Sequence, residues 1–118
     1  MKKDRMPQVN SLIHEEISMI LLTELQDPRL KRITVTGVDT SPDLSQAKVY
    51  ITFITGSEEA TEEEQAEGVS ILQKAAGLVR KLLAHRIKLR KVPELHFKYD
   101  KSTIEGAKIE RELKNLGF

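Results

Sequence analysis

The residues best suited to chemistry in this sequence are the bases between positions 74 and 91. This segment holds seven Lys or Arg residues and no Asp or Glu. Clustered bases neutralise phosphates, whereas ordinary exposed helix faces mix both signs, because opposite charges at i,i+4 stabilise a helix. The segment therefore favours an anion-binding surface, such as one for nucleic acid, over a plain solvated helix face.

On an ideal helix, at about 100° per residue, most of these bases lie opposite the apolar residues. The side away from the apolar stripe carries Lys74, Lys81, His85 and Lys88, with Arg80 and Lys91 on an adjoining side. Arg86 and Arg90 fall out of phase, which predicts either a helix end near Arg86 or a shift of register at Gly77. A second basic group, Arg29, Lys31 and Arg32, precedes the first predicted strand and is equally compatible with a solvated loop.

The form of nucleic-acid binding is limited by the aromatic content, which is only 4%. A sheet that stacks bases needs two or three exposed aromatic side chains, and the outward sheet face offers only Tyr50. Binding through helix faces is therefore favoured. Small residues at Ala75, Ala76 and Gly77 interrupt the long helix and allow a phosphate backbone to approach the main chain. Tight packing of the helix on the sheet also accounts for small residues here, and both explanations can hold at the same time.

Catalytic chemistry finds no support in the sequence. It contains no glycine-rich phosphate loop, no Gly-x-Ser-x-Gly elbow and no His-Glu-x-x-His pair. The three histidines are too scattered to suggest a metal site, and the chain has no cysteine, which excludes thiolate metal sites and cysteine nucleophiles. We therefore expect a protein that is not an enzyme and has no metal, no cofactor and no small-molecule substrate.

The elements that must position the basic segment fit one domain over residues 1–118. The chain is 39% hydrophobic and 31% charged, and its net charge of +1 conceals an acidic run at 58–67 beside the basic one. The longest apolar run spans four residues, and no stretch of signal-peptide type follows the first residues, so we expect a cytoplasmic protein without a membrane span. Residues 1–5 and 117–118 are expected to be frayed.

Hydrophobic spacing predicts an α+β fold. Helical spacing begins at Val9 and should end at Asp27-Pro28, and Thr61 with Glu64 fits a capping box at the start of a long helix that is interrupted at Gly77. Alternation predicts three strands, at 33–40, 47–54 and 95–99, the first two forming an antiparallel hairpin, and a tail helix is predicted at 103–116. The helices should pack on one face of the sheet.

The same alternation assigns the two faces of the sheet. The residues expected to face the helices are Ile33, Val35, Val49, Ile51, Phe53, Leu95, Phe97 and Tyr99. Those expected to face away are Thr34, Thr36, Lys48, Tyr50, Thr52, His96 and Lys98.

Several pieces of the sequence, in order over some 80 residues, resemble the bacterial ribosome-binding factor A family. The pieces are Asp27-Pro-Arg-Leu30, Ile33-Thr-Val-Thr-Gly-Val38, Asp43-Leu44, Ala47-Lys-Val-Tyr50, Ala75-Ala-Gly-Leu-Val-Arg80, Leu89-Arg90, Pro93-Glu-Leu, Phe97, Asp100, Ser102 and Gly106. The resemblance implies a type II KH-like fold of the order helix, strand, strand, helix, kink, helix, strand. Its kink, which replaces the Gly-x-x-Gly loop of ordinary KH domains, maps to residues 75–77. The chain stops at Phe118, so we expect it to lack the longer tail of some relatives.

The resemblance also implies a function. Family members are ribosome assembly factors that bind the free 30S small ribosomal subunit, assist maturation of the 5′ region of 16S rRNA and support growth in the cold. For this chain the expected partners are the small subunit and 16S rRNA, bound by a monomer. Two alternatives remain open: a general single-stranded RNA-binding KH module, and a protein-interaction adaptor that uses the acidic run at 58–67.

Overall fold

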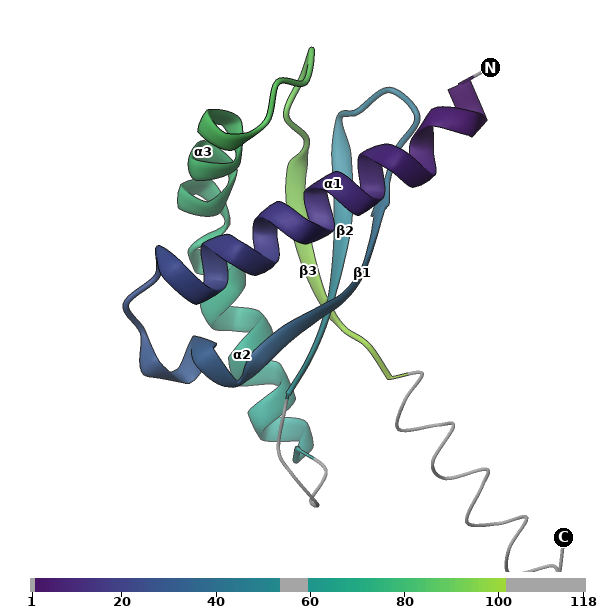
Figure 1. The fold of residues 1–118 in the computed structure, drawn as a ribbon. Helices are drawn as coiled ribbons and strands as arrows, with labels where there is room; N and C mark the ends of the chain where they lie inside the picture. The colour runs from purple at the N-terminus through teal and green to yellow at the C-terminus, as the bar shows by residue number, and fades with distance from the viewer. Residues whose placement is uncertain (1, 54–59, 102–118) are drawn as a thin grey trace, which may run out of the picture.

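The computed structural model describes residues 2–53 and 60–101 of the chain (Figure 1). Its elements are α1 (Lys2–Thr23), the 3-10 helix η1 (Pro28–Arg32), β1 (Ile33–Thr40), β2 (Gln46–Phe53), α2 (Glu62–Lys74), α3 (Ala76–Arg86) and β3 (Glu94–Tyr99). The predicted order of helices and strands is confirmed. The tail helix expected at 103–116 and the frayed end expected at 117–118 lie outside the described residues.

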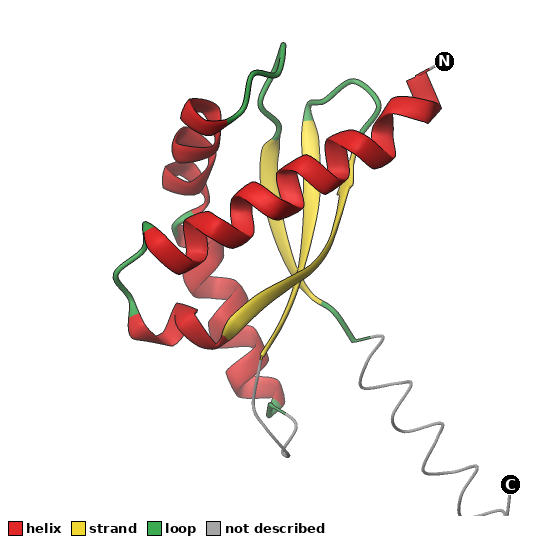
Figure 2. Cartoon of the chain, in the orientation of Figure 1, coloured by secondary structure: helices red, strands yellow, loops and turns green. Residues whose placement is uncertain are grey.

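The three strands form one sheet in the order β1-β2-β3. β1 and β2 pair antiparallel, as the hairpin prediction required, and β2 and β3 pair in parallel. Parallel neighbours need a long crossover, which α2 and α3 supply. Within residues 2–53 and 60–101 the helices all lie on one face of the sheet, as Figure 2 shows.

The predicted faces of the sheet match the burial of the strands. Ile33, Val35, Val49, Ile51, Leu95 and Phe97 are buried beneath the helices, and Lys48 and Lys98 are exposed on the other side. A bulge shifts the β1–β2 register between Val35 and Gly37. Thr36 is the extra residue of the bulge and has no partner in the β2 register. The side chains of β1 therefore match the faces of β2 on both sides of the bulge, and Val38 faces the helices opposite Val49.

The core joins the inward face of the sheet to one stripe of each helix. Its fully buried side chains include Ile13, Ile17 and Ile20 of α1, Leu72 of α2, Val79 and Leu83 of α3, and Val49 and Ile51 of β2. Burial of a large aliphatic side chain stabilises the folded state by about 1.5–3 kcal/mol. This core fixes α3 against α1 and β3, and it therefore determines which side of α3 meets solvent.

The first helix differs from its prediction at both ends. It begins at Lys2, so residues 2–5, which were expected to be frayed, continue the helix, and it ends at Thr23. Asp27-Pro28 does not end α1 as predicted but starts η1, because the Asp27 side chain accepts a hydrogen bond from the backbone N–H of Arg29 and Pro28 suits a first helical position. The sequence signal marked a helix start instead of a helix end.

The β1–β2 turn is held by the carboxylate of Asp43. Its Oδ1 accepts hydrogen bonds from Ser41 Oγ at 2.7 Å, from Ser45 Oγ at 2.7 Å and from Ser45 N at 3.0 Å. These donors, the Ser45 hydroxyl first, hold the pKa of Asp43 far below its ordinary value. The turn is therefore a pre-formed loop as long as Asp43 is ionised.

Replacement of Asp43 should make the chain less sensitive to acid. A pKa lowered on folding means that the ionised carboxylate stabilises the folded state above the ordinary pKa of 3.8, and that this contribution is lost as pH falls below it. We expect Asp43→Ala to lower the melting temperature at pH 7 and the gap to the parent chain to narrow between pH 5 and pH 2. Thermal unfolding followed by circular dichroism measures this gap, and a gap independent of pH would contradict the assigned role.

Candidate nucleic-acid interface

The junction between α2 and α3 is a backbone break at Ala75. α2 ends at Lys74, Ala75 has φ −88° and ψ −1°, and α3 begins at Ala76. The N–H of Ala75 still donates to the carbonyl of Ile71, but no side chain caps the start of α3. The kink predicted at residues 75–77 is present, and its centre is Ala75, not Gly77.

Gly77 lies within the first turn of α3 and not at the interruption of the helix, where the sequence analysis placed it. A Cβ built on Gly77 meets no atom within 4 Å, and Gly77 is not in the left-handed region. Neither a close contact nor an unusual backbone geometry therefore requires glycine here.

Gly77→Ala should consequently raise the stability of the chain. An alanine in a helix loses less backbone entropy on folding, and we expect a gain of about 0.5–1 kcal/mol in the free energy of unfolding. Gly68→Ala is the matched comparison, because its Cβ would lie 2.8 Å from Phe53 Cζ and should forfeit part of that gain. Urea denaturation of both variants tests the point, and a loss of stability in Gly77→Ala would restore Gly77 as the strained residue of the kink.

Four basic side chains around α3 are exposed: Lys74 at the end of α2, Lys81 and His85 on α3, and Lys88 in the following loop. Among the described residues none of the four has an ion pair or a side-chain hydrogen bond. We call these four residues the α3 basic surface. Lys81 and His85, four positions apart on α3, share the side of that helix that faces away from the core, and Lys74 and Lys88 flank its two ends.

An exposed leucine interrupts this surface. Leu78 is 51% exposed and follows Lys74 by four positions and precedes Lys81 by three. The sequence analysis did not single it out, although the helical spacing alone placed it among the lysines. Its position offers an apolar contact between cations, which suits a ligand that has both phosphates and bases.

Three of the predicted arginines form hydrogen bonds or ion pairs with other residues of the chain. Arg80 donates through Nε and Nη2 to the carbonyl of Val92, at 3.2 and 2.9 Å. Arg86 Nε lies 2.6 Å from Glu16 Oε2, and its Nη1 lies 3.7 Å from Glu24 Oε1. Arg80 thus holds the α3–β3 loop and Arg86 ties α3 to α1, which explains why Arg86 falls out of phase with the basic side.

The third engaged arginine belongs to the basic group before β1. Arg29 pairs with Asp27 at 2.8 Å and with Glu67 of α2 at 3.1 Å, and these carboxylates, Asp27 first, raise its pKa. Lys31 and Arg32 of the same group are exposed. Arg90 and Lys91, in the loop after α3, are exposed as well. The structure therefore leaves these four as a possible margin, with Lys31 and Arg32 on η1 instead of beside α3.

The acidic run is partly used within the fold. Glu64 completes the predicted capping box with Thr61, whose backbone and side-chain hydrogen bonds lower the pKa of Glu64. Glu67 is the partner of Arg29. Both contacts stabilise the N-terminal half of α2 and its attachment to η1.

The described part of the chain contains no group of three or more histidines and carboxylates that could hold a metal ion. His14, His85 and His96 lie on α1, α3 and β3 respectively. No helix among residues 2–53 and 60–101 has the length and apolar character needed to cross a membrane.

Comparisons with known proteins agree on one family. The family model described as ribosome-binding factor A matches residues 5–113. The chain is 40% identical to ribosome-binding factor A of Halothermothrix orenii over 98% of its own length and 91% of the relative, and 40% identical to that of Alkalilimnicola ehrlichii over 91% and 79%.

Solved structures give the same result. The crystal structure of ribosome-binding factor A from Thermus thermophilus is similar, with a TM-score of 0.67 and 26% identity over 82% of this chain and 97% of that one. A homology model of the Thermus thermophilus factor, fitted into a cryo-EM map of its 30S complex, has a TM-score of 0.61 and 25% identity over 78% and 91%. The predicted α+β, KH-like fold is confirmed.

Proposed function

This chain belongs to the ribosome-binding factor A family, and we propose that it is a non-enzymatic assembly factor that binds the free small ribosomal subunit through its α3 basic surface. The observation that carries the proposal is its likeness to a relative fitted into a map of a complex with the 30S subunit. We infer further that it works in the cytoplasm as a monomer and assists maturation of the 5′ region of 16S rRNA, with most effect in the cold.

The lysines are the contacts that we assign to rRNA. Lys74, Lys81 and Lys88 are exposed and have no partner among the described side chains, so their charges are available to phosphates. Arg80 and Arg86 act differently in this proposal: they hold the loop and α1 in place and thereby present the lysines. Lys31, Arg32, Arg90 and Lys91 form the margin of the contact.

Selectivity for the subunit follows from the chemistry of this surface. Lysine contacts to phosphates carry no base identity, and the surface has no Phe, Tyr or Trp side chain for stacking. The protein must therefore recognise an arrangement of phosphates that folded rRNA presents. Such an arrangement exists in a free small subunit and changes when the large subunit joins.

Co-sedimentation tests this proposal. We expect the chain to sediment with free small subunits and to be largely absent from joined ribosomes, and a strain without it to accumulate 16S rRNA with an unprocessed 5′ end, more so at low temperature. Equal binding to free subunits, joined ribosomes and unstructured RNA, with normal rRNA ends in the deletion strain, would instead identify a general RNA-binding module.

A further inference from the structure

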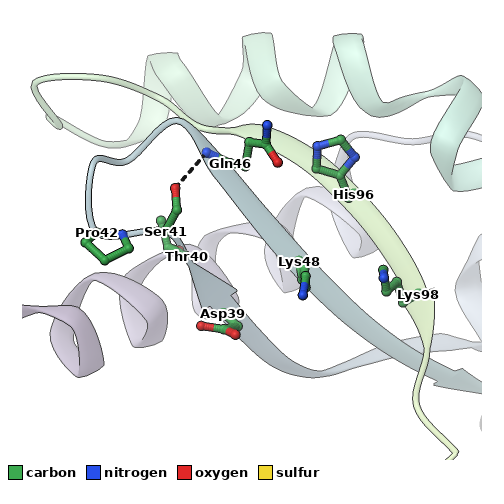
Figure 3. A pocket seen from close by; sticks show the side chains of 8 residues that line it. All are labelled: Asp39, Thr40, Ser41, Pro42, Gln46, Lys48, His96 and Lys98. Carbon is green, nitrogen blue, oxygen red and sulfur yellow. Dashed lines mark hydrogen bonds between the residues drawn. The ribbon is translucent and has the colours of Figure 1, made fainter.

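The face of the sheet opposite to the helices contains a pocket that the proposed function does not use. Its volume is about 460 Å³, within the range of small-molecule sites. Figure 3 shows the side chains that line it, contributed by the three strands and the β1–β2 turn. The pocket therefore lies on the side of the sheet opposite to the helices.

Strand register brings its charged groups together. Asp39 pairs with Lys48, and Lys48 pairs with His96, so the three form one row across β1, β2 and β3. Lys98 follows His96 by two positions and shares its face, diagonal to Lys48. Long lysine side chains on diagonal positions can converge on one anion.

These groups are not engaged with one another. Among the described residues Lys48 and Lys98 are exposed and have no ion pair or side-chain hydrogen bond. The Nε2 atom of His96 is buried and finds no hydrogen-bond partner in the part of the chain that the structure describes. A buried polar atom left unsatisfied destabilises the protein, so a ligand that gives this nitrogen a partner, directly or by moving the side chains around it, gains affinity.

Hydrogen bonds within the β1–β2 turn close the rim of the pocket. Ser41 Oγ donates to the Asp43 carboxylate and accepts from the backbone N–H of Gln46, as the dashed line in Figure 3 marks. Ser41 N donates to the carbonyl of Gln46 at 2.8 Å. A turn closed by these bonds requires no ordering when a ligand arrives.

We propose that this pocket binds one nucleotide, with its phosphate between Lys48 and Lys98 and its hydroxyl or amino groups donating to Asp39. Two ammonium groups match a phosphate, and a carboxylate on the neighbouring strand matches ribose hydroxyls or an exocyclic amine but repels a second phosphate. The nucleotide is either free or part of an RNA strand. The inference goes beyond the proposed function, because neither a free nucleotide nor a nucleotide within an RNA strand needs a ribosome in order to bind.

Titration of the full chain, followed by backbone and histidine-ring NMR signals, tests the site. The probes are adenosine monophosphate and a four-nucleotide RNA. We expect saturable shifts at Lys48, His96 and Lys98: shifts with both probes assign a free nucleotide as a sufficient ligand, and shifts with RNA alone assign a nucleotide within a strand. Absence of saturable shifts at these residues with both probes would overturn the proposal.

Variants make the test specific. Lys48→Gln with Lys98→Gln should weaken the binding of the responding probe at least about tenfold, since two charge-assisted hydrogen bonds are lost. Both side chains are exposed, so the fold should persist, and signals outside the pocket report this. Lys48→Gln and Lys98→Gln are also made singly, and the matched control for each is Lys101→Gln, which removes one charge at an exposed position that does not line this pocket. Equal weakening by the control would show that binding depends only on overall charge.

Discussion

The chain in which Lys74, Lys81 and Lys88 are all replaced by Glu should lose affinity for RNA of the small subunit by a factor on the order of 100 or more. Three exposed, unpartnered cations become anions, and attraction to phosphates becomes repulsion. If about four to six phosphates are neutralised, the parent should show a slope of log K against log salt near −3 to −4, and the variant a slope shallower by about 2. Filter binding over a salt series measures both.

Net charge alone must be separated from the position of the charge. Replacing Lys74 and Lys81 with Gln lowers the net charge by two units, and so do Gln8→Glu and Ser11→Glu together, at exposed positions on the N-terminal half of α1. We expect the first set to weaken binding clearly more than the second. An unchanged salt slope in the Glu variant would rule out the α3 basic surface as the RNA contact. Equal losses of RNA affinity in the Lys→Gln variant and in the variant with new Glu residues on α1 would rule it out as well.

Leu83→Ala should be the most destabilising small change on α3, lowering the free energy of unfolding by about 2–5 kcal/mol. Leu83 is fully buried in the cluster that joins α3 to α1 and the sheet, and truncation leaves a cavity there. Leu78 on the same helix is 51% exposed, so Leu78→Ala should change stability by no more than about 0.5 kcal/mol. Urea denaturation compares the two variants.

The pair also separates folding from binding. Leu78→Ala should fold normally and bind RNA less well, because it removes an apolar contact among the lysines. Leu83→Ala should bind normally at temperatures where it is still folded. The account of α3 would be wrong if Leu78→Ala were as destabilising as Leu83→Ala, since the two faces of the helix would then be reversed.

Local chemistry in the sequence was sufficient for much of the fold. The strand at 33–40 and the capping box of Thr61 with Glu64 each follow from neighbouring residues, and the structure confirms them. Of the two alternatives that the sequence left open for Arg86, the structure shows the helix end. Asp27-Pro28 is a helix boundary, as predicted, but it starts η1 and does not end α1. Either boundary was compatible with the sequence, because Asp before Pro disfavours a continuing helix and also caps a new one.

Features that depend on distant partners could not be predicted in this way. The bulge at Thr36 is visible only from the register with β2, and the position of the predicted break within residues 75–77, at Ala75, is visible only from the backbone geometry. The sequence showed that Arg86 is out of phase with the lysines, but it could not show that the partner of Arg86 is Glu16, seventy positions away. The sequence therefore located the candidate site only as a basic segment. The structure separates its exposed lysines from Arg80 and Arg86, which bond to other residues of the chain.

Directed cleavage of rRNA tests the central claim, that α3 meets rRNA in the small subunit. The chain has no cysteine, so a single one can carry a tethered iron chelate. Ala84→Cys places it on exposed α3 between Lys81 and Lys88, and Ser11→Cys places it on the N-terminal half of α1, which extends away from α3 (Figure 1). With free small subunits we predict localised 16S rRNA cleavage from position 84 and little from position 11. Stronger cleavage from position 11, or none from position 84 while the protein remains bound, would contradict the account.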